Sequence, residues 1–288
     1  MSTDDDWEKW GQRDPYFGVI TLDRFRMAKL DETARTEFFE TGRWHVEYVW
    51  TLCRRYVDAG FAPRTVLDFG CGVGRMLMHF ARDVEQVVGV DISSSMLKEA
   101  RRNCEVFGAG NVAFAASIQE LPAGMTQFDL VHSVIVLQHL DPERGLQVFA
   151  QLLAAIAPGG IGAIQVTHAK MVHASNLGVS PVTRPVPESV RNLTSGVRKR
   201  RLLAKWFERG AARPRAEGLP GADDTLPVAR PPEGADPEMQ MNSYNLNQLF
   251  FLLQRAGVPR FHSEFTDHGG ELGVFLFFQK PREPGTLG

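Results

Sequence analysis

The sequence predicts an α/β protein with a doubly wound sheet of seven strands, of which the last strand is antiparallel. Short apolar runs alternate with helical patterns from residue 66 to residue 168, which indicates parallel strands covered by helices on both faces. A glycine-rich stretch follows the first apolar run, where a strand would turn into a helix. Two more apolar runs meet at a polar turn near the C-terminus, which predicts a closing antiparallel hairpin.

Two patterns precede the first strand. Apolar residues recur at helical spacing through residues 31–59, and Gly42 interrupts them, so we expect two helices there. The aromatic-rich stretch 7–20 is punctuated by glycine and proline, and a packing stripe on a helix explains it poorly.

Five short strands are expected in the first part of the chain. The first strand is predicted at residues 66–69, and the apolar residues behind Arg75 predict the helix that follows it. Ser93 or Ser94 opens the helix behind the second strand. The other strands are expected at residues 87–90, 111–117, 128–140 and, after a Pro-Gly-Gly turn, 158–168.

The regular alternation stops after the fifth strand. Residues 212–238 are rich in proline, which is typical of a loop or linker, and residues 184–217 carry ten basic and three acidic side chains. Order returns with an apolar helix at 244–257 and a hairpin that turns at 267–270. We therefore expect an inserted cap at residues 170–240.

Composition and charge exclude several classes of protein. Hydrophobic residues make up 43% and charged residues 23%, and the formal net charge of −2 gives no global argument for nucleic acid or anionic membrane. Three cysteines without a C-x-x-C pair argue against a disulfide framework or a structural zinc site. No apolar run reaches the length of a membrane span, and the acidic first residues lack the layout of a signal peptide. We expect a cytoplasmic location.

The stretch VLDFGCGVGRM lies where the first strand meets its helix. Gly70, Gly72 and Gly74 can adopt positive φ and let a ligand approach the backbone, beside a helix N-terminus that presents free N–H groups. A dinucleotide fingerprint needs its third glycine one residue later, where Arg75 stands, and the G-K-[ST] of a phosphate-binding loop does not occur. The pattern predicts a small-molecule site that does not cradle a pyrophosphate.

The stretch LDFGCGVGR resembles the glycine motif of the class I S-adenosylmethionine-dependent methyltransferases, which runs hydrophobic–hydrophobic–Asp–x–Gly–x–Gly–x–Gly. Asp91 stands seventeen residues after Gly74, where that family places an acid on the ribose hydroxyls. The Pro-Gly-Gly strand and the hairpin also match, with good register over 66–167 and more loosely over 244–280. The resemblance implies a Rossmann-like fold, methyltransferase activity and S-adenosyl-L-methionine as the cofactor.

The resemblance also assigns residues to the cofactor. The glycines would hold its methionine end, Asp68 would lie near its ammonium group, and Asp91 would accept from both ribose hydroxyls. Ser117 stands where the family commonly has an acid on adenine. Simpler roles stay open, because Asp68 could cap the turn and Asp91 could be an ordinary acid at a helix N-terminus. The expected set is Asp68, Gly70, Cys71, Gly72, Gly74, Asp91, Ile92, Ser117, Ile118, Ser133 and Val134.

Transfer to a hydroxyl group usually needs a base, and histidine is the usual candidate. His139 follows the fourth strand at the carboxyl edge of the sheet, where ligands of doubly wound folds bind. His168, in the neighbouring loop, is the alternative catalytic residue, and a structural role for His139 stays open.

Several residues are expected at the acceptor. The aromatic-rich start would act as a lid or pack on the outer face of the sheet. The stretch FTDHGGELG gathers three polar groups that suit a tight turn, an acceptor contact or, less well, a metal, although the spacing fits no metal motif and we expect none. The expected substrate residues are Tyr16, Phe17, His173 and His268.

Four segments follow from these observations: an N-terminal lid with helices at 1–60, a cofactor-binding core at 61–169, the basic, proline-rich cap at 170–240, and a C-terminal helix and hairpin at 241–288. We expect transfer of a methyl group to oxygen or nitrogen of a small metabolite, without membrane or nucleic-acid partners and with a homodimer left open. The alternatives are an RNA or protein acceptor and a non-catalytic binding module. For the cap, a solvated basic face, a site for an acidic acceptor and contact with RNA or anionic lipid all remain open.

Overall fold

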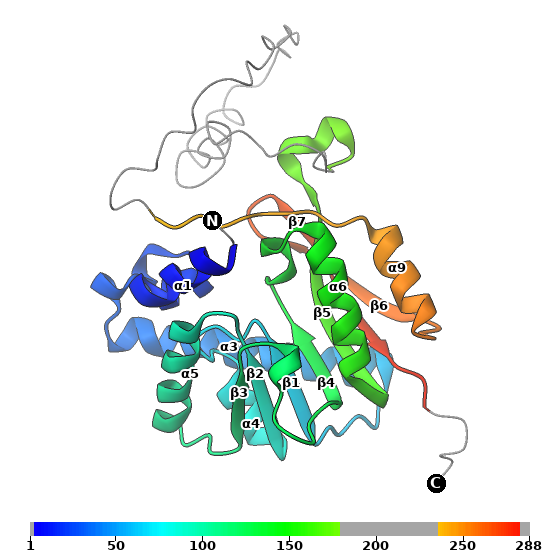
Figure 1. Ribbon diagram of the computed structural model, residues 1–288, viewed down its shortest axis with the longest axis horizontal. Helices are drawn as coiled ribbons and strands as arrows, with labels where there is room; N and C mark the ends of the chain where they lie inside the picture. The colour runs from blue at the N-terminus through cyan, green and yellow to red at the C-terminus, as the bar shows by residue number, and fades with distance from the viewer. Residues whose placement is uncertain (1–2, 179–235, 283–288) are drawn as a thin grey trace, which may run out of the picture. The chain divides into compact units, whose positions relative to one another are not determined.

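The computed structural model describes residues 3–178 and 236–282, which build one seven-stranded sheet flanked by helices (Figure 1). The strand order is β3-β2-β1-β4-β5-β7-β6, and β7 runs antiparallel to both of its neighbours. The predicted fold class is therefore confirmed. The strands are β1 Thr65–Phe69, β2 Gln86–Val90, β3 Val112–Ala115, β4 Phe128–Ser133, β5 Ile156–Lys170, β6 Phe261–Asp267 and β7 Glu271–Gln279.

Helices cover both faces of this sheet. Successive strand residues point to opposite faces, so Val66 of β1 shares a core with α3, α4 and α5, whereas Leu67 shares one with α6 and α9. The helices are α1 Thr3–Arg13, α2 Pro15–Val19, α3 Glu32–Leu52, α4 Leu77–Asp83, α5 Ser94–Val106, α6 Pro142–Ala155 and α9 Leu246–Arg255. Shorter helical turns are η1 Asp23–Phe25, η2 Met27–Lys29, η3 Cys53–Val57, η4 Ile118–Glu120, η5 Leu137–His139 and η6 Met171–Asn176.

The aromatic-rich start forms the helices α1 and α2, which corrects the expectation that a helix explains it poorly. Gly11 lies against the N-terminus of α5, where an added Cβ would come within 2.5 Å of Ser93 Oγ. Pro15 begins α2, a position at which its missing N–H costs no hydrogen bond. The small residues therefore mark close packing and a helix start, and not an irregular segment.

Helix α3 is continuous through Gly42, so the prediction of two helices before the first strand is wrong. Gly42 is buried against the end of the glycine turn, and a Cβ there would lie 2.1 Å from the carbonyl oxygen of Arg75. The glycine allows two backbones to meet, and tertiary contact outweighs the roughly 1 kcal/mol that glycine costs inside a helix.

Two strand boundaries also differ from the prediction. β4 ends at Ser133 and not at residue 140, because Ile135 adopts a φ of +58° that a strand does not hold. β5 begins at Ile156, so the Pro-Gly-Gly segment lies within the strand. The helix expected at 244–257 and the terminal hairpin are confirmed as α9, β6 and β7.

The basic stretch 184–217 lies outside the described residues. Over the described part of the chain, no helix has the length and apolar character that crossing a membrane requires.

Replacement of Gly42 by alanine tests the contact between α3 and the glycine turn. Alanine normally stabilises a helix interior, but here its methyl group must displace the Arg75 carbonyl. We expect Gly42→Ala to lower the free energy of unfolding by roughly 1–3 kcal/mol, the usual cost of overpacking. Thermal or urea unfolding measures the change. Gly110→Ala is the matched control, because nothing lies within 4 Å of its Cβ position. Equal stability of the two variants would contradict the contact.

Candidate functional site

The glycine turn follows β1 at the carboxyl edge of the sheet. Gly70, Gly72 and Gly74 all have positive φ, at +76°, +53° and +80°. A Cβ on Gly70 would lie 2.1 Å from the side chain of Val136, and one on Gly72 would lie 2.6 Å from Val19. Neighbouring segments therefore close tightly on a backbone that only glycine allows.

Asp91, just beyond β2, is hydrogen-bonded to this turn. Its carboxylate accepts from the N–H of Gly72 at 2.8 Å and from the N–H of Ser93 at 2.9 Å. Burial raises the pKa of Asp91 to about 6, although the two backbone hydrogen bonds oppose that shift. Asp91 thus joins the glycine turn to the start of α5, at the position predicted for a ribose ligand.

Three buried polar groups near the turn lack a hydrogen-bond partner among the described residues. They are Asp68 Oδ2, Arg75 Nε and Ser133 Oγ. Asp68 and Ser133 are fully buried, and burial lowers the pKa of Arg75 to about 10, against the attraction of Asp68. An unpaired buried polar group is costly. One unsatisfied atom each on a carboxylate, a guanidinium and a hydroxyl fits a zwitterionic ligand such as the methionine end of the predicted cofactor.

A strained loop after β4 closes over the turn. Ile135 is β-branched and has a φ of +58°, a conformation that such residues rarely adopt. Its N–H donates to Oε1 of the buried Gln165 on β5 at 3.0 Å, which holds the loop in place. Val136, the next residue, packs on Gly70. Sequence reasoning missed Ile135 and Gln165, because neither residue type signals a positive φ.

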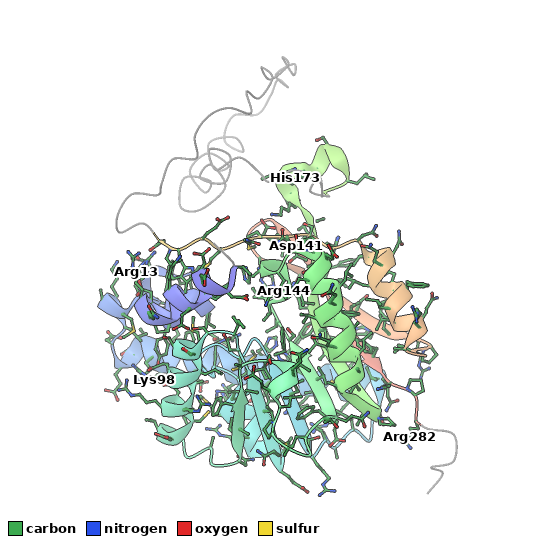
Figure 2. The ribbon with its side chains drawn as sticks, viewed as in Figure 1. Arg13, Lys98, Asp141, Arg144, His173 and Arg282 are labelled. Atoms are coloured by element: carbon green, nitrogen blue, oxygen red, sulfur yellow. The ribbon has the colours of Figure 1, made fainter. Side chains whose placement is uncertain are left out.

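Helix α1 spans the carboxyl edge of the sheet. On one side, Glu8 of α1 accepts hydrogen bonds from the hydroxyls of Ser93 and Ser95 at the start of α5. Burial raises the pKa of Glu8, but the bonds from Ser95 and Ser93 outweigh it and lower the pKa to about 2. On the other side, Arg144 of α6, labelled in Figure 2, donates to Asp4 of α1 at 2.7 Å. The N-terminal helices therefore bridge the loops behind β2 and β4.

The remaining predicted cofactor residues lie around the same edge. Ile92 is 45% exposed next to Asp91, and Ser117 donates to Glu120 at 3.2 Å ahead of η4. Ile118 packs against the core beneath α6, and Val134 against the core beneath α3. Cys71 is buried and its pKa is raised well above the ordinary value by burial, which suits a packing residue within the turn. Their contacts with a cofactor remain predictions.

His139 is buried on η5 and held by the segment that follows the insertion. Its Nδ1 donates to the Gln240 carbonyl at 2.7 Å, and Trp7 of α1 packs edge-on against its ring. Burial lowers the pKa of His139 to about 4, against hydrogen bonds to the carbonyls of Gln240 and Ile135. Nδ1 is occupied by its bond to Gln240 in a buried position, which suits the structural alternative, and a role of His139 as the base stays a prediction.

The predicted acceptor residues do not form one cluster. Tyr16 is fully buried and its hydroxyl donates to Glu99 at 2.7 Å, which suits a core residue better than an acceptor contact. Phe17 packs on Trp10 and beneath Arg26. Its acceptor role, like the others below, stays a prediction.

The three histidines predicted near the acceptor lie on separate elements, and His168 is part of β5 and not of the loop that follows it. His168, near the end of β5, lies 6.3 Å from the ring of Phe265, and burial lowers the pKa of both His168 and His268. Figure 2 shows His173 on η6, which extends past the end of β5. At the hairpin tip, Asp267 accepts from the Gly270 N–H at 2.7 Å, a tight-turn contact. The described residues contain no group of three or more His, Cys, Asp or Glu side chains that could hold a metal ion.

Comparisons with known proteins agree with this geometry. Residues 66–160 match a family model described as "Methyltransferase domain". Malonyl-[acyl-carrier protein] O-methyltransferase of Enterobacter lignolyticus is 30% identical over 47% of this chain and 54% of its own length. The 23S rRNA (uracil(747)-C(5))-methyltransferase RlmC of Vibrio vulnificus is 30% identical over 42% of this chain and 31% of its own length. The chain thus spans less than two thirds of the curated relatives it matches.

Among solved structures, magnesium protoporphyrin IX methyltransferase from Synechocystis with bound SAH superposes with a TM-score of 0.53 at 16% identity. The superposition covers 93% of this chain and 97% of that one, which shows a shared fold. Residues 66–160 thus match a methyltransferase domain, and the family model and the fold agree with the predicted resemblance to the class I S-adenosylmethionine-dependent methyltransferases.

Asp91→Ala tests the ribose position. The variant removes the acceptor of charge-assisted hydrogen bonds, so we expect S-adenosylhomocysteine binding to weaken by roughly 1–3 kcal/mol, measured by isothermal titration calorimetry. Glu85→Ala is the control, because it removes an exposed carboxylate at the opposite end of β2. Unchanged affinity in Asp91→Ala would contradict the assignment.

The affinity of the wild type should also depend on pH. Since the pKa of Asp91 is raised to about 6, its carboxylate takes up a proton as the pH falls through 6 and loses the charge that attracts ribose hydroxyls. We expect the dissociation constant of S-adenosylhomocysteine to rise between pH 7 and pH 5 in the wild type. The same titration with Asp91→Ala should lack this component, and an identical pH dependence in the variant would rule out Asp91 as its source.

Proposed function

We propose that this protein binds S-adenosyl-L-methionine at the glycine turn and transfers its methyl group to an oxygen or nitrogen atom of a small metabolite. The observation that carries the proposal is the set of three buried atoms without a hydrogen-bond partner among the described residues, Asp68 Oδ2, Arg75 Nε and Ser133 Oγ, next to the glycine turn. Asp68 would accept from the ammonium group of the cofactor and Arg75 would pair with its carboxylate. Asp91 would accept from the ribose hydroxyls.

Once bound, the cofactor supplies a sulfonium-activated methyl group, so the protein mainly orients the acceptor and excludes water. Helix α1 and the loop 134–136 cover the carboxyl edge on two sides, which suits that task. Glu8 and Ser93 would fix α1 over the cofactor. The residues that line the acceptor would then come from the segment behind β5 and from the hairpin tip, as the predicted positions of His168 and His268 suggest.

A small acceptor fits the covered edge better than a macromolecule does. The N-terminal helices lie against the glycine turn, since Val19 packs on Gly72. The relative from Vibrio that acts on 23S rRNA keeps RNA as the second candidate, but the match spans only 31% of that protein.

The cysteines give a chemical reason against methylation of a base carbon. Such a carbon needs activation, for which a thiolate nucleophile is one route. All three cysteines of the chain are buried. Burial raises the pKa of Cys53 to about 12 and that of Cys104 to about 11, and it raises that of Cys71 well above its ordinary value. Oxygen and nitrogen acceptors need no such thiolate.

A labelled-methyl assay tests the proposal. The protein is incubated with methyl-labelled S-adenosylmethionine and either a panel of phenols, sugars and primary amines or purified ribosomal RNA. We expect label to enter the small-molecule fraction and not the RNA, and the Asp91→Ala protein to transfer less at limiting cofactor. Label in RNA that declines steeply with added salt would overturn the small-molecule proposal, because phosphate contacts give that dependence.

A further inference from the structure

A chain of three hydrogen-bonded side chains runs from the cofactor turn to helix α3. Asp68 of β1 and His132 of β4 are neighbours in the parallel register of the sheet. The Asp68 Oδ1 atom lies 2.7 Å from His132 Nδ1, and His132 Nε2 lies 2.9 Å from Nε2 of His45 on α3. Neither His132 nor His45 has a role in the function proposed above.

The positions of the protons on these three side chains follow from which of their atoms can donate and which can only accept. A carboxylate only accepts, so His132 donates its Nδ1–H to Asp68, and in its neutral form it presents a lone pair on Nε2. The second contact then requires His45 to donate its Nε2–H. His45 therefore carries its remaining lone pair on Nδ1, which makes no hydrogen bond to any residue that the structure describes.

The three hydrogen-bonded side chains lead from the protein interior toward the surface. Asp68 and His132 are fully buried, whereas His45 is partly exposed. The His45 ring stacks on Phe275 of β7, with centroids 5.7 Å apart and planes 16° apart, and it lies next to Tyr48. His268 at the hairpin tip, one of the predicted acceptor residues, is near enough to His45 to affect its pKa.

Burial keeps His45 unprotonated. It lowers the pKa of His45 well below the ordinary value, and the positive charge of Arg75 acts in the same direction. Tyr48, the neighbour of His45 on α3, has its pKa raised by burial and by the negative charge of Glu264 on β6. At neutral pH, His45 is thus an uncharged imidazole whose Nε2 is hydrogen-bonded to His132 and whose Nδ1 has no hydrogen-bond partner among the described residues.

We propose that His45 is the catalytic base of this site, with His132 and Asp68 as positioning residues. The inference rests on the methyl transfer proposed above. As the new carbon–oxygen or carbon–nitrogen bond forms, the carbon–sulfur bond breaks and its electron pair stays on sulfur. The acceptor proton moves to His45 Nδ1. The resulting imidazolium donates from Nε2 to His132, and the Asp68 carboxylate at the far end of the chain stabilises its charge.

This assignment differs from the prediction of His139. His139 is buried with its Nδ1 bonded to the Gln240 carbonyl, whereas His45 is partly exposed and is held at Nε2 by a histidine that is itself bonded to a carboxylate. His45 also belongs to the arrangement by which proteins commonly orient a histidine base, in which a second group fixes its tautomer and supports its charge.

The first test needs neither cofactor nor acceptor. Long-range ¹H–¹⁵N NMR spectra of the ligand-free protein report the tautomer of each histidine. We expect His45 as the Nε2–H tautomer with unprotonated Nδ1 across pH 6–8, and a mixed tautomer in His132→Phe. His45 protonated on Nδ1 in the wild type would overturn the proposal even if His132→Phe does not fold.

The second test separates catalysis from structure. With an acceptor from the phenol, sugar and amine panel, we expect His45→Gln to lower the methylation rate by roughly 10²–10⁴, while S-adenosylhomocysteine affinity changes less than about twofold. Free imidazole should partly restore the rate of His45→Ala. His262→Gln, on the edge strand β6, is the control and should match the wild type.

The outcomes distinguish the two proposals. An active wild type with an equally active His45→Gln variant would overturn the role of His45 and leave the proposed function intact. A wild type that binds S-adenosylhomocysteine but transfers no label to any member of the panel would count against the proposed function, and the tautomer measurement would still decide whether the chain is arranged as a base. Loss of cofactor affinity in His45→Gln would point to a structural role and overturn the base.

Discussion

The parallel register between β1 and β4 is the constraint on which the site depends. It sets Asp68 beside His132 and ends both strands at the same edge, so that the glycine turn and the loop with Ile135 meet there. The two segments are so close that Val136 occupies the space of a Gly70 side chain. A shift of one residue would turn Asp68 toward the opposite face, because the side-chain period of a strand is two residues. The position of every group around the turn therefore follows from the pairing of two short strands.

Most features that the sequence predicted correctly depend on residues that lie close together along the sequence. The glycine turn, Asp91 and the capping Ser93 are recognisable because their chemistry lies within a few residues of each other. Gly42 misled the prediction, since its role is to admit the Arg75 backbone from another part of the chain. Helix propensity is a weak guide wherever a tertiary contact decides the residue.

The chain from Asp68 to His45 could not be found in the sequence. Its members are separated by 64 and 87 positions, and the contact depends on how α3 is rotated against the sheet. His132 looked like an ordinary buried histidine, and His45 like one of several on predicted helices. His139 stood out only because it follows a strand, and its buried contacts with Gln240 and Trp7 depend on segments far away along the chain.

The segment 236–245 returns to the sheet at the point where the chain left it. Tyr244 donates from its backbone N–H to Thr167 of β5, and the Lys170 side chain donates to the Met241 carbonyl. The point where the polypeptide leaves the sheet and the point where it returns are thus fixed within a few residues of each other, whatever segment lies between them. Closing a longer loop costs only about 0.6 kcal/mol for each doubling of its length. The fold therefore accepts inserts of very different size at this edge, and an acceptor specificity encoded there could be exchanged between proteins as a module without redesign of the sheet.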